Sequence, residues 1–402
     1  MTEKETQEMM RSVFETNNNA KVSLPTAGFL ILAGLLILGS FLILPAAAHV
    51  PLTSGDNTHI DDAFPVTDPT KSWVIYGDLA GAGDVRYYQM EMVAGDELRL
   101  SLFTPEGTAA FVPGLVVMGP GLSSSGTPPS FVEMPHPDEE HHEEDIPLDD
   151  TMDMLHAEDG HETSEEPAIY GTVVIEGTMP AGADFEPFTP SALYPAAAYS
   201  QQVTAPGTWY VAVYAPETSA SGGNFGLAVG YREEFTFSEW LLVPFSVIGI
   251  HRWEGQSWVT ILGPLLLTVI AGFGLLFWQG RRERKTGTTI VGPFGWLAVT
   301  AGLFYLGTGM MLLVQTLLAL SKAGMTGGAI LPAVYIAVAI LSGGFAIRIG
   351  LRSTGWGSKT NGISMIAVGI VGLFMWAGLL VGPVCAFAAG AGAIVYGKKR
   401  PE

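Results

Sequence analysis

The chain has a single cysteine, Cys385, among its 402 residues. One cysteine cannot form an intrachain disulfide. It also excludes CxxC redox motifs and thiolate zinc sites, which need several cysteines. Any part of the chain that folds outside the cytoplasm must therefore be stabilised by its hydrophobic core alone.

Acidic residues and histidine are nearly missing from the C-terminal third, and the basic residues there lie near the ends of the predicted spans. Between residues 259 and 402 the only acidic residues are Glu283 and Glu402, and there is neither histidine nor aspartate. Ion-coupled transport, proton relays and intramembrane hydrolysis need such groups within the bilayer. The polar residues Gln315 and Ser364 are expected to form hydrogen bonds between helices. Paired small residues predict close helix packing: Gly378 with Gly382, Ala386 with Gly390, and Ala388 with Gly392.

The chain also lacks the short motifs of common enzymes. It contains no GxSxG nucleophile elbow, no glycine-rich phosphate loop and no Cys/His pair. It shows no basic patch for nucleic acid. We therefore predict a protein that is not an enzyme, and no catalytic residue is assigned.

Long hydrophobic runs are what the chain has instead. Residues 26–44 are uncharged and long enough to span ~30 Å of hydrocarbon. Pro45-Ala46-Ala47-Ala48 follows them, so residues 26–48 are an uncleaved signal anchor or a cleaved signal peptide. We favour the anchor, with residues 1–25 as a cytoplasmic tail. Either interpretation exports the residues that follow.

The remaining runs form a predicted helical bundle at 259–402. Runs at 259–279, 291–320 and 329–347 are each long enough to span, and Arg281-Arg282-Glu283-Arg284-Lys285 marks the cytoplasmic side of the first. The last run, 363–396, is too long for one upright helix and contains Gly382-Pro383 near its middle, so a hairpin is expected there. This gives about six spans, with five as the alternative, and a cytoplasmic C-terminus.

Residues 238–258 are rich in tryptophan, and we expect an interfacial helix in which Trp240, Trp253 and Trp258 lie at the bilayer surface. An alternative makes His251, Arg252 and Glu254 a binding site there. We favour an aromatic belt with solvated charges.

The exported region, residues 49–237, has the alternation of an antiparallel β-sandwich. Tyr88, Met90 and Met92 share one face of a strand, and Gly95-Asp96 predicts a tight hairpin to the next strand. The expected strands are 72–76, 86–92, 97–103, 115–118, 172–175, 198–203, 209–214 and 225–229.

Two blocks of this region resemble a known family. Residues 83–102, GDVRYYQMEMVAGDELRLSL, and residues 205–229, with APGTWYVAVY and GNFGLAV, are similar to the opening and closing strands of the bacterial pre-peptidase C-terminal (PPC) domain. The resemblance implies a small β-sandwich that acts as an accessory or binding module. This chain departs from the pattern by a long insertion and by its fusion to membrane helices, and it has no peptidase domain.

The insertion, residues 119–169, concentrates the charge of the chain. Residues 133–166 hold fifteen Asp and Glu, five of the eight His and no Lys or Arg, and they carry −15 of the net −20. Imidazoles bind Zn and Cu, and thioethers favour Cu(I). The predicted metal ligands are His136, His141, His142, His156, His161, Met134, Met152 and Met154. The alternative is a solvated acidic loop that binds no metal usefully.

The sequence therefore predicts a multidomain membrane protein: an extracytoplasmic PPC-like sandwich, an interfacial helix and a transmembrane bundle. Its expected function is extracytoplasmic binding or interaction, as an accessory subunit of a membrane complex, with the loop gathering divalent Zn or Cu ions. The alternative is a component of a metal transporter. The expected partners are the lipid bilayer, other membrane subunits and metal ions, without nucleic acid.

Overall fold

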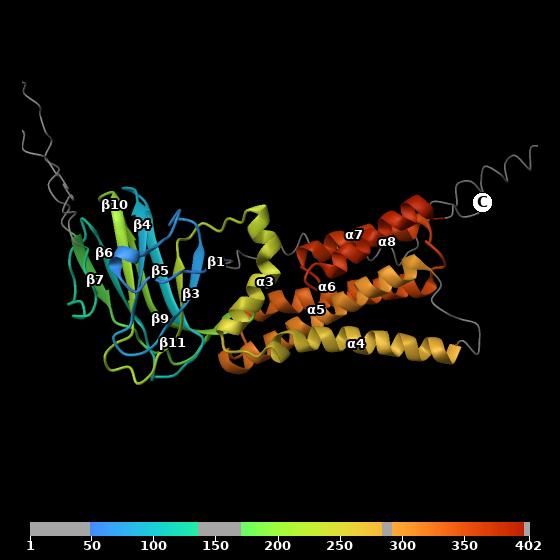
Figure 1. Ribbon diagram of the computed structural model, residues 1–402, viewed down its shortest axis with the longest axis horizontal. Coiled ribbons are helices and arrows are strands. Elements are labelled where there is room, and N and C mark those ends of the chain that lie inside the picture. The colour runs from blue at the N-terminus through green and yellow to red at the C-terminus, as the bar shows by residue number, and fades with distance from the viewer. Residues whose placement is uncertain (1–48, 136–169, 284–291, 398–402) are drawn as a thin grey trace, which may run out of the picture. The chain divides into compact units, whose positions relative to one another are not determined.

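The structure is a computed structural model that describes residues 49–135, 170–283 and 292–397. The described chain divides into two compact units. The sandwich unit comprises Ala48–Asp184 and Leu193–Thr236, and the helical unit comprises Phe185–Ala192 and Phe237–Glu402. Figure 1 draws the strands in blue to yellow-green and the helices that follow residue 236 in yellow through orange to red.

The sandwich unit contains two sheets. The six-stranded sheet has the order β1-β3-β11-β5-β9-β8, and the five-stranded sheet has the order β2-β4-β10-β6-β7. The bounds in the first sheet are β1 Val50–Leu52, β3 Trp73–Leu79, β11 Gly223–Val229, β5 Glu97–Thr104, β9 Ser191–Gln202 and β8 Asp184–Glu186. Those in the second are β2 Phe64–Pro65, β4 Val85–Met92, β10 Gly207–Tyr214, β6 Gly114–Pro120 and β7 Tyr170–Ile175. All eight predicted strands are present.

Alternation along the strands builds the core between the sheets. Tyr88, Met90 and Met92 of β4 are buried in one cluster with Leu98, Leu100 and Leu102 of β5, as their period of two predicts. Trp209 and Phe225 from the closing strands belong to the same cluster and are almost fully buried. Burial of these side chains is the main stabilising term, since the chain has no disulfide to assist it.

The five-stranded sheet is also covered on its other face. Tyr87, Val116 and Ala212 form a second buried cluster there with Ile60 and Val132. Ile60 precedes the first long strand, and Val132 follows β6, so two loop segments cover this face. The alternation along β4 predicts that Tyr87 and Tyr88 point to opposite faces of the sheet. It does not reveal that the face carrying Tyr87 is buried as well.

The predicted hairpin at Gly95-Asp96 is wrong. Strands β4 and β5 flank this turn but belong to different sheets, so the turn carries the chain across the sandwich. Gly95 has φ +97, which glycine adopts without strain. The backbone N–H of Gly95 donates to the carbonyl of Val203, and the backbone N–H of Val203 donates to the carbonyl of Asp96. The turn is thus fixed by the end of β9 rather than by pairing of its own strands.

Three short strands were not predicted, and two of them make the sandwich partly parallel. β1 pairs in parallel with β3, and β2 pairs in parallel with β4. β9 begins seven residues before the predicted start at 198 because it runs past a register shift opposite Leu102 and Phe103. Pro195 pairs at that irregularity, where the missing N–H of proline disrupts the ladder least.

Residues 119–135, the first part of the predicted insertion, are ordered parts of the sandwich. β6 pairs with β7 through Pro120↔Tyr170, and Leu122 and Val132 are buried in the two clusters. The N–H of Ser125 donates to the carbonyl of Thr172, which holds this segment on the edge strand. Strand β6 ends at Pro120 and its partner β7 begins at Tyr170, and the histidine-bearing residues lie outside the described ranges.

The first helix of the helical unit among the described residues is α3 (Phe237–Trp253), where the sequence predicts an interfacial helix. The helices that follow are α4 (Trp258–Glu283), α5 (Pro293–Ala323), α6 (Ile330–Arg352), α7 (Lys359–Phe374) and α8 (Val381–Tyr396). Within the described residues, three helices are long and apolar enough to cross a membrane: Trp258–Arg281, Pro293–Ala323 and Gly327–Arg352. Helix α5 contacts α4, α6 and α8.

The last hydrophobic run folds as two short apolar helices, α7 and α8, that pack side by side (Figure 1). The break lies at residues 375–380 and not at Gly382-Pro383. Trp376, Leu379 and Leu380 have positive φ, which ends α7. Pro383 is in the first turn of α8, where an N–H has no intrahelical acceptor and its loss costs little.

Small residues bring the helices into close contact, as the sequence predicts, but at additional positions. A Cβ on Gly302 of α5 would lie 2.6 Å from the carbonyl oxygen of Gly343 in α6. Gly362 and Gly390 stand in the same relation in α7 and α8. Of the predicted pairs, Ala386 and Gly390 are both buried; Gly378 instead lies in the break with φ +60, and Ala388 is exposed.

Candidate functional site

Most of the predicted metal ligands lie outside the described residues. These are the five histidines His136, His141, His142, His156 and His161, with Met152 and Met154. Met134 is described, and its side chain packs against the second cluster of the sandwich. No group of three or more His, Cys, Asp or Glu that would hold a metal ion is found in the described ranges. The metal ligands therefore stay a prediction.

A polar contact lies near the end of the first described range, residues 49–135. Nδ1 of His59 lies 2.8 Å from Oε1 of Glu133, and the backbone N–H of Ile60 donates to Oε2 of the same carboxylate at 2.8 Å. The N–H of Glu133 donates to the buried Tyr87 hydroxyl at 2.7 Å. Glu133 thus fixes the root of the loop to the segment before the first long strand. His59 stays exposed but is paired.

The pKa of His59 is raised by the hydrogen bond and the charge of Glu133. We expect nuclear magnetic resonance titration of residues 49–236 to give His59 a pKa above 6.5 and Glu133→Gln to return it toward that value. The protonated form is favoured in the folded state, so its stabilisation is full below pH 6.5 and is lost as pH rises through the raised pKa. His49, whose pKa is lowered by burial, is the internal control. An unchanged His59 titration in Glu133→Gln would contradict the contact.

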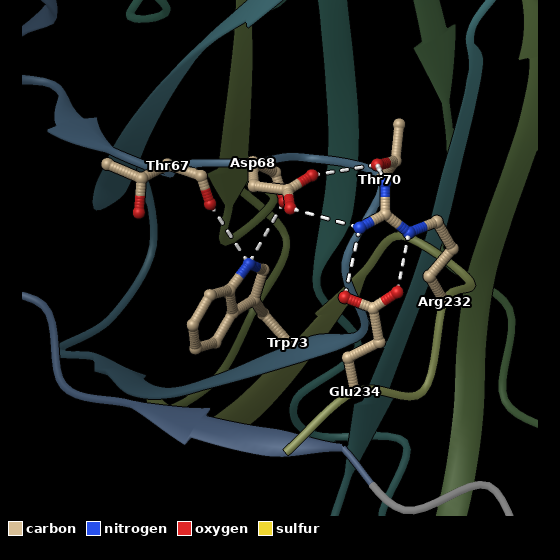
Figure 2. Close-up of polar contacts among 6 residues, drawn as sticks. All are labelled: Thr67, Asp68, Thr70, Trp73, Arg232 and Glu234. Atoms are coloured by element: carbon tan, nitrogen blue, oxygen red, sulfur yellow. Dashed lines mark hydrogen bonds and ion pairs between the residues drawn. The ribbon is translucent and has the colours of Figure 1, made fainter. Parts of the chain in front are cut away.

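A second polar cluster fastens the chain where it leaves the sandwich (Figure 2). The guanidinium of Arg232 faces the carboxylate of Glu234, with nitrogen–oxygen distances of 3.3 and 3.0 Å, and donates to the Thr70 hydroxyl at 3.1 Å. That hydroxyl donates to Asp68 at 2.7 Å, and this bond is the main reason that the pKa of Asp68 is lowered. The indole of Trp73 donates to the Thr67 and Asp68 carbonyls. The cluster satisfies its own charges, so we assign it a structural role.

The predicted interfacial tryptophans lie on and after α3. Trp240 packs against Trp376 at 5.6 Å between ring centroids, and its carbonyl accepts a hydrogen bond from the Trp376 indole at 2.7 Å. Trp253 is half-buried. Trp258 is 57% exposed, and Arg252 lies over its ring at 5.4 Å. Trp240 therefore joins α3 to the break between α7 and α8, and Trp258 retains the exposure that an interfacial position requires.

The expectation of solvated charges on this helix holds for Arg252 but is wrong for His251 and Glu254. The side chain of His251 is 2% exposed and that of Glu254 is 10% exposed, and Nδ1 of the histidine lies 2.9 Å from Oε2 of the carboxylate. The amide of Gln256 donates to the same oxygen at 2.9 Å. Because a carboxylate accepts, Nδ1 carries the shared hydrogen, and Nε2 is the ring nitrogen that is left for another partner.

Gln315, near the outer end of α5 in the predicted topology, is 2% exposed. Neither its amide nitrogen nor its amide oxygen has a hydrogen-bond partner among the described residues. The hydroxyl of Ser364 donates to the Thr360 carbonyl within its own helix. The predicted interhelical hydrogen bonds are therefore absent for both residues in the described part of the chain. A buried amide without a partner is costly, so Gln315 requires an explanation.

His251 and Gln315 line one cavity of about 100 Å³ in the helical unit. Thr308 also lines it, but the Thr308 hydroxyl already donates to Phe304 and accepts from the N–H of Gly378. The apolar part of the wall comes from α3, α5 and α6, from residues 187–190 and from the break after α7, and it includes Val243, Val247, Met311, Leu312, Tyr335 and Met375. An apolar cavity with a few convergent polar groups is the usual form of a small-molecule site.

The cavity was not predicted. Gln315 is a polar residue in an apolar run and His251 belongs to the alternative site on the predicted interfacial helix, but the two are 64 positions apart in the sequence. A histidine followed three residues later by a glutamate is the signal that was available in the sequence. Nothing in the periodicity of α5 indicates that Gln315 lacks a partner.

The chain therefore consists of a β-sandwich unit and an apolar helical unit, and the helical unit contains a mainly apolar cavity that is also lined by the polar side chains of His251, Thr308 and Gln315. No known family model matches the chain, and no curated protein matches it either. The resemblance of residues 83–102 and 205–229 to the PPC domain therefore stays a prediction.

Proposed function

We propose that this chain is a membrane-anchored, non-enzymatic binding protein. The observation that carries the proposal is Gln315, a buried amide that has no partner in the described residues and lines a cavity. Stability alone does not favour such a residue, whereas a binding site does, because function commonly retains groups that the fold leaves unsatisfied. A metal-transporting role has less support, since residues 259–402 contain no histidine and no aspartate.

The proposed topology has six spans. The first is residues 26–44, the next three are the long helices of the helical unit, and α7 and α8 form the last two. Each of these two has 16 residues, ~24 Å at 1.5 Å per residue, which requires a thinned bilayer or lipid headgroups close to their ends. The sandwich unit then lies outside the cytoplasm and the C-terminus lies inside.

The topology predicts which positions react with a membrane-impermeant thiol reagent. In a Cys385→Ala background, we expect Ser124→Cys to be labelled on intact cells and Thr288→Cys to be labelled only after the cells are opened. Ser124 belongs to the sandwich unit, and Thr288 follows the basic cluster that marks the cytoplasmic side. Labelling of position 288 but not 124 on intact cells would overturn the orientation.

The acidic loop is proposed to gather divalent metal ions outside the membrane, for this protein or for a membrane complex of which it is an accessory subunit. The support is compositional: fifteen carboxylates and five histidines in residues 133–166. The sandwich adds one structural argument: β6 and β7, which flank the insertion, pair directly with each other from Leu115↔Ile175 to Pro120↔Tyr170, so this pairing is made by described residues alone.

Calorimetry tests the metal proposal. We expect the chain to bind several Zn or Cu ions weakly, and binding should weaken as pH falls through ~6.5 because only neutral imidazole ligates. Changing His136, His141, His142, His156 and His161 together to Gln keeps every carboxylate, so Ca binding is the internal control. Zn affinity that survives this change would show a nonspecific carboxylate effect. A single nanomolar site would also contradict the proposal, since it requires a preformed set of ligands.

A further inference from the structure

The geometry points to one kind of ligand for the cavity of the helical unit: a neutral molecule with a small apolar body and a hydroxyl group. This inference rests on the binding role proposed above and specifies the chemistry of that site. Its two anchors are the side chains of Gln315 and His251, which come from α5 and α3.

The polar atoms of the cavity wall that have no hydrogen-bond partner determine which polar group the ligand should carry. The amide of Gln315 offers N–H donors and a carbonyl acceptor, and none of them is paired in the described residues. A ketone or an ether would accept from Nε2 of Gln315 but would leave its Oε1 without a donor. A hydroxyl both accepts and donates, so it satisfies the amide nitrogen and then either Oε1 or Nε2 of His251.

The charge of the wall selects a neutral ligand. Among the described residues that line the cavity, none is Asp, Glu, Lys or Arg. The charge nearest to His251 is Glu254, and it is already bound by that histidine and by Gln256. A carboxylate, phosphate or ammonium group would enter without a counterion and would retain its full desolvation cost.

The volume and the lining of the cavity limit the size of the apolar part of the ligand that it can hold. A cavity of ~150 Å³ lined by aliphatic and aromatic side chains holds benzene, so the 100 Å³ here admits fewer heavy atoms than one ring. The methionines Met311 and Met375 are unbranched and adapt to irregular shapes. Together these features fit the hydroxyl end of an aliphatic alcohol, with any longer chain outside the cavity.

Photolabelling of the full chain in phosphatidylcholine nanodiscs tests this assignment. The probe is an octanol that carries a diazirine, and the matched probe is the corresponding octane without the hydroxyl. We expect the alcohol to label peptides containing Met311 or Met375, and excess 1-octanol, but not octane, to prevent it. Gln315→Leu should reduce this labelling roughly tenfold, the equivalent of one lost hydrogen bond. Thr316→Val, at the next residue of the same helix, should leave it unchanged.

The other outcomes separate the ligand class from the binding role. If both probes label these peptides equally and Gln315→Leu has no effect, the cavity binds apolar molecules and the hydroxyl assignment is overturned. If neither probe labels them, the ligand class and the binding role of the cavity both fail. Thermal melting of each variant in the same nanodiscs shows whether it is folded, so a loss of labelling in Gln315→Leu cannot be ascribed to unfolding.

Discussion

Gly302→Ala is expected to destabilise the helical unit by about 1–3 kcal/mol, the usual cost of inserting a methyl group into a closely packed interior. The new Cβ would lie 2.6 Å from the carbonyl oxygen of Gly343 and 2.6 Å from Cγ1 of Ile347. One of these is a backbone atom, so rotation of a side chain cannot relieve the overlap. Helices α5 and α6 must then separate, and they share the most extensive helix contact of the unit.

Gly344→Ala is the matched control for this prediction. Gly344 lies in α6 next to Gly343, but it is exposed and a Cβ there would meet nothing within 4 Å. Alanine in an open helix position should be neutral or stabilising by up to ~1 kcal/mol, because it has less backbone freedom than glycine to lose. Thermal melting of the full chain in one detergent measures both variants. Equal melting temperatures for the two would show that α5 and α6 are not in close contact.

The sandwich could be predicted from sequence wherever a strand has one buried face. Leu98, Leu100 and Leu102 show an alternation of two that only a half-buried strand explains. The same logic does not identify which strands are neighbours. The turn at Gly95-Asp96 is equally consistent with a hairpin and with a crossing between sheets, and the choice depends on Val203, more than a hundred residues away. Long-range pairing of this kind leaves no local signal.

The helices were predicted from the same physical argument, but their breaks were not. An uninterrupted apolar run indicates a span, and Pro383 predicts the point of interruption. The chain instead breaks at residues whose left-handed conformation, as at Leu379 and Leu380, has no preference encoded in their own side chains. It is stabilised by the surroundings, including the hydrogen bond from the N–H of Gly378 to the Thr308 hydroxyl.

The candidate site depends on tertiary structure to a still greater degree. Sequence analysis assigned Gln315 to helix contacts and His251 to the water-facing side of an interfacial helix. Burial of His251 follows from the way that α3 packs, which includes the contact of Trp240 with Trp376. Amphipathic patterning cannot reveal this, because α3 is apolar on most of its surface. A buried polar residue is recognised as unsatisfied only when every neighbour has been placed.

Gln315→Leu is expected to stabilise the protein in the absence of ligand by about 1–3 kcal/mol, the cost of leaving a buried polar group without a partner. Leucine is close to glutamine in volume, so the substitution changes the polarity of the wall with little change in its shape. The two amide atoms that have no partner in the described residues are removed, and no hydrogen bond of the described structure is broken. Most substitutions in a helix core destabilise, so the sign of this effect is distinctive.

Thr316→Val provides the comparison at the neighbouring position. The hydroxyl of Thr316 is buried but donates to the carbonyl of Leu312 at 2.7 Å, so its removal breaks a bond and should be neutral or slightly destabilising. Both variants are melted in detergent with and without 1-octanol. We expect Gln315→Leu to melt above the wild type without the alcohol and to gain less from its addition. A Gln315→Leu protein that melts below Thr316→Val would show that the amide already has a partner, and the cavity would then lose the polar group on which ligand binding depends.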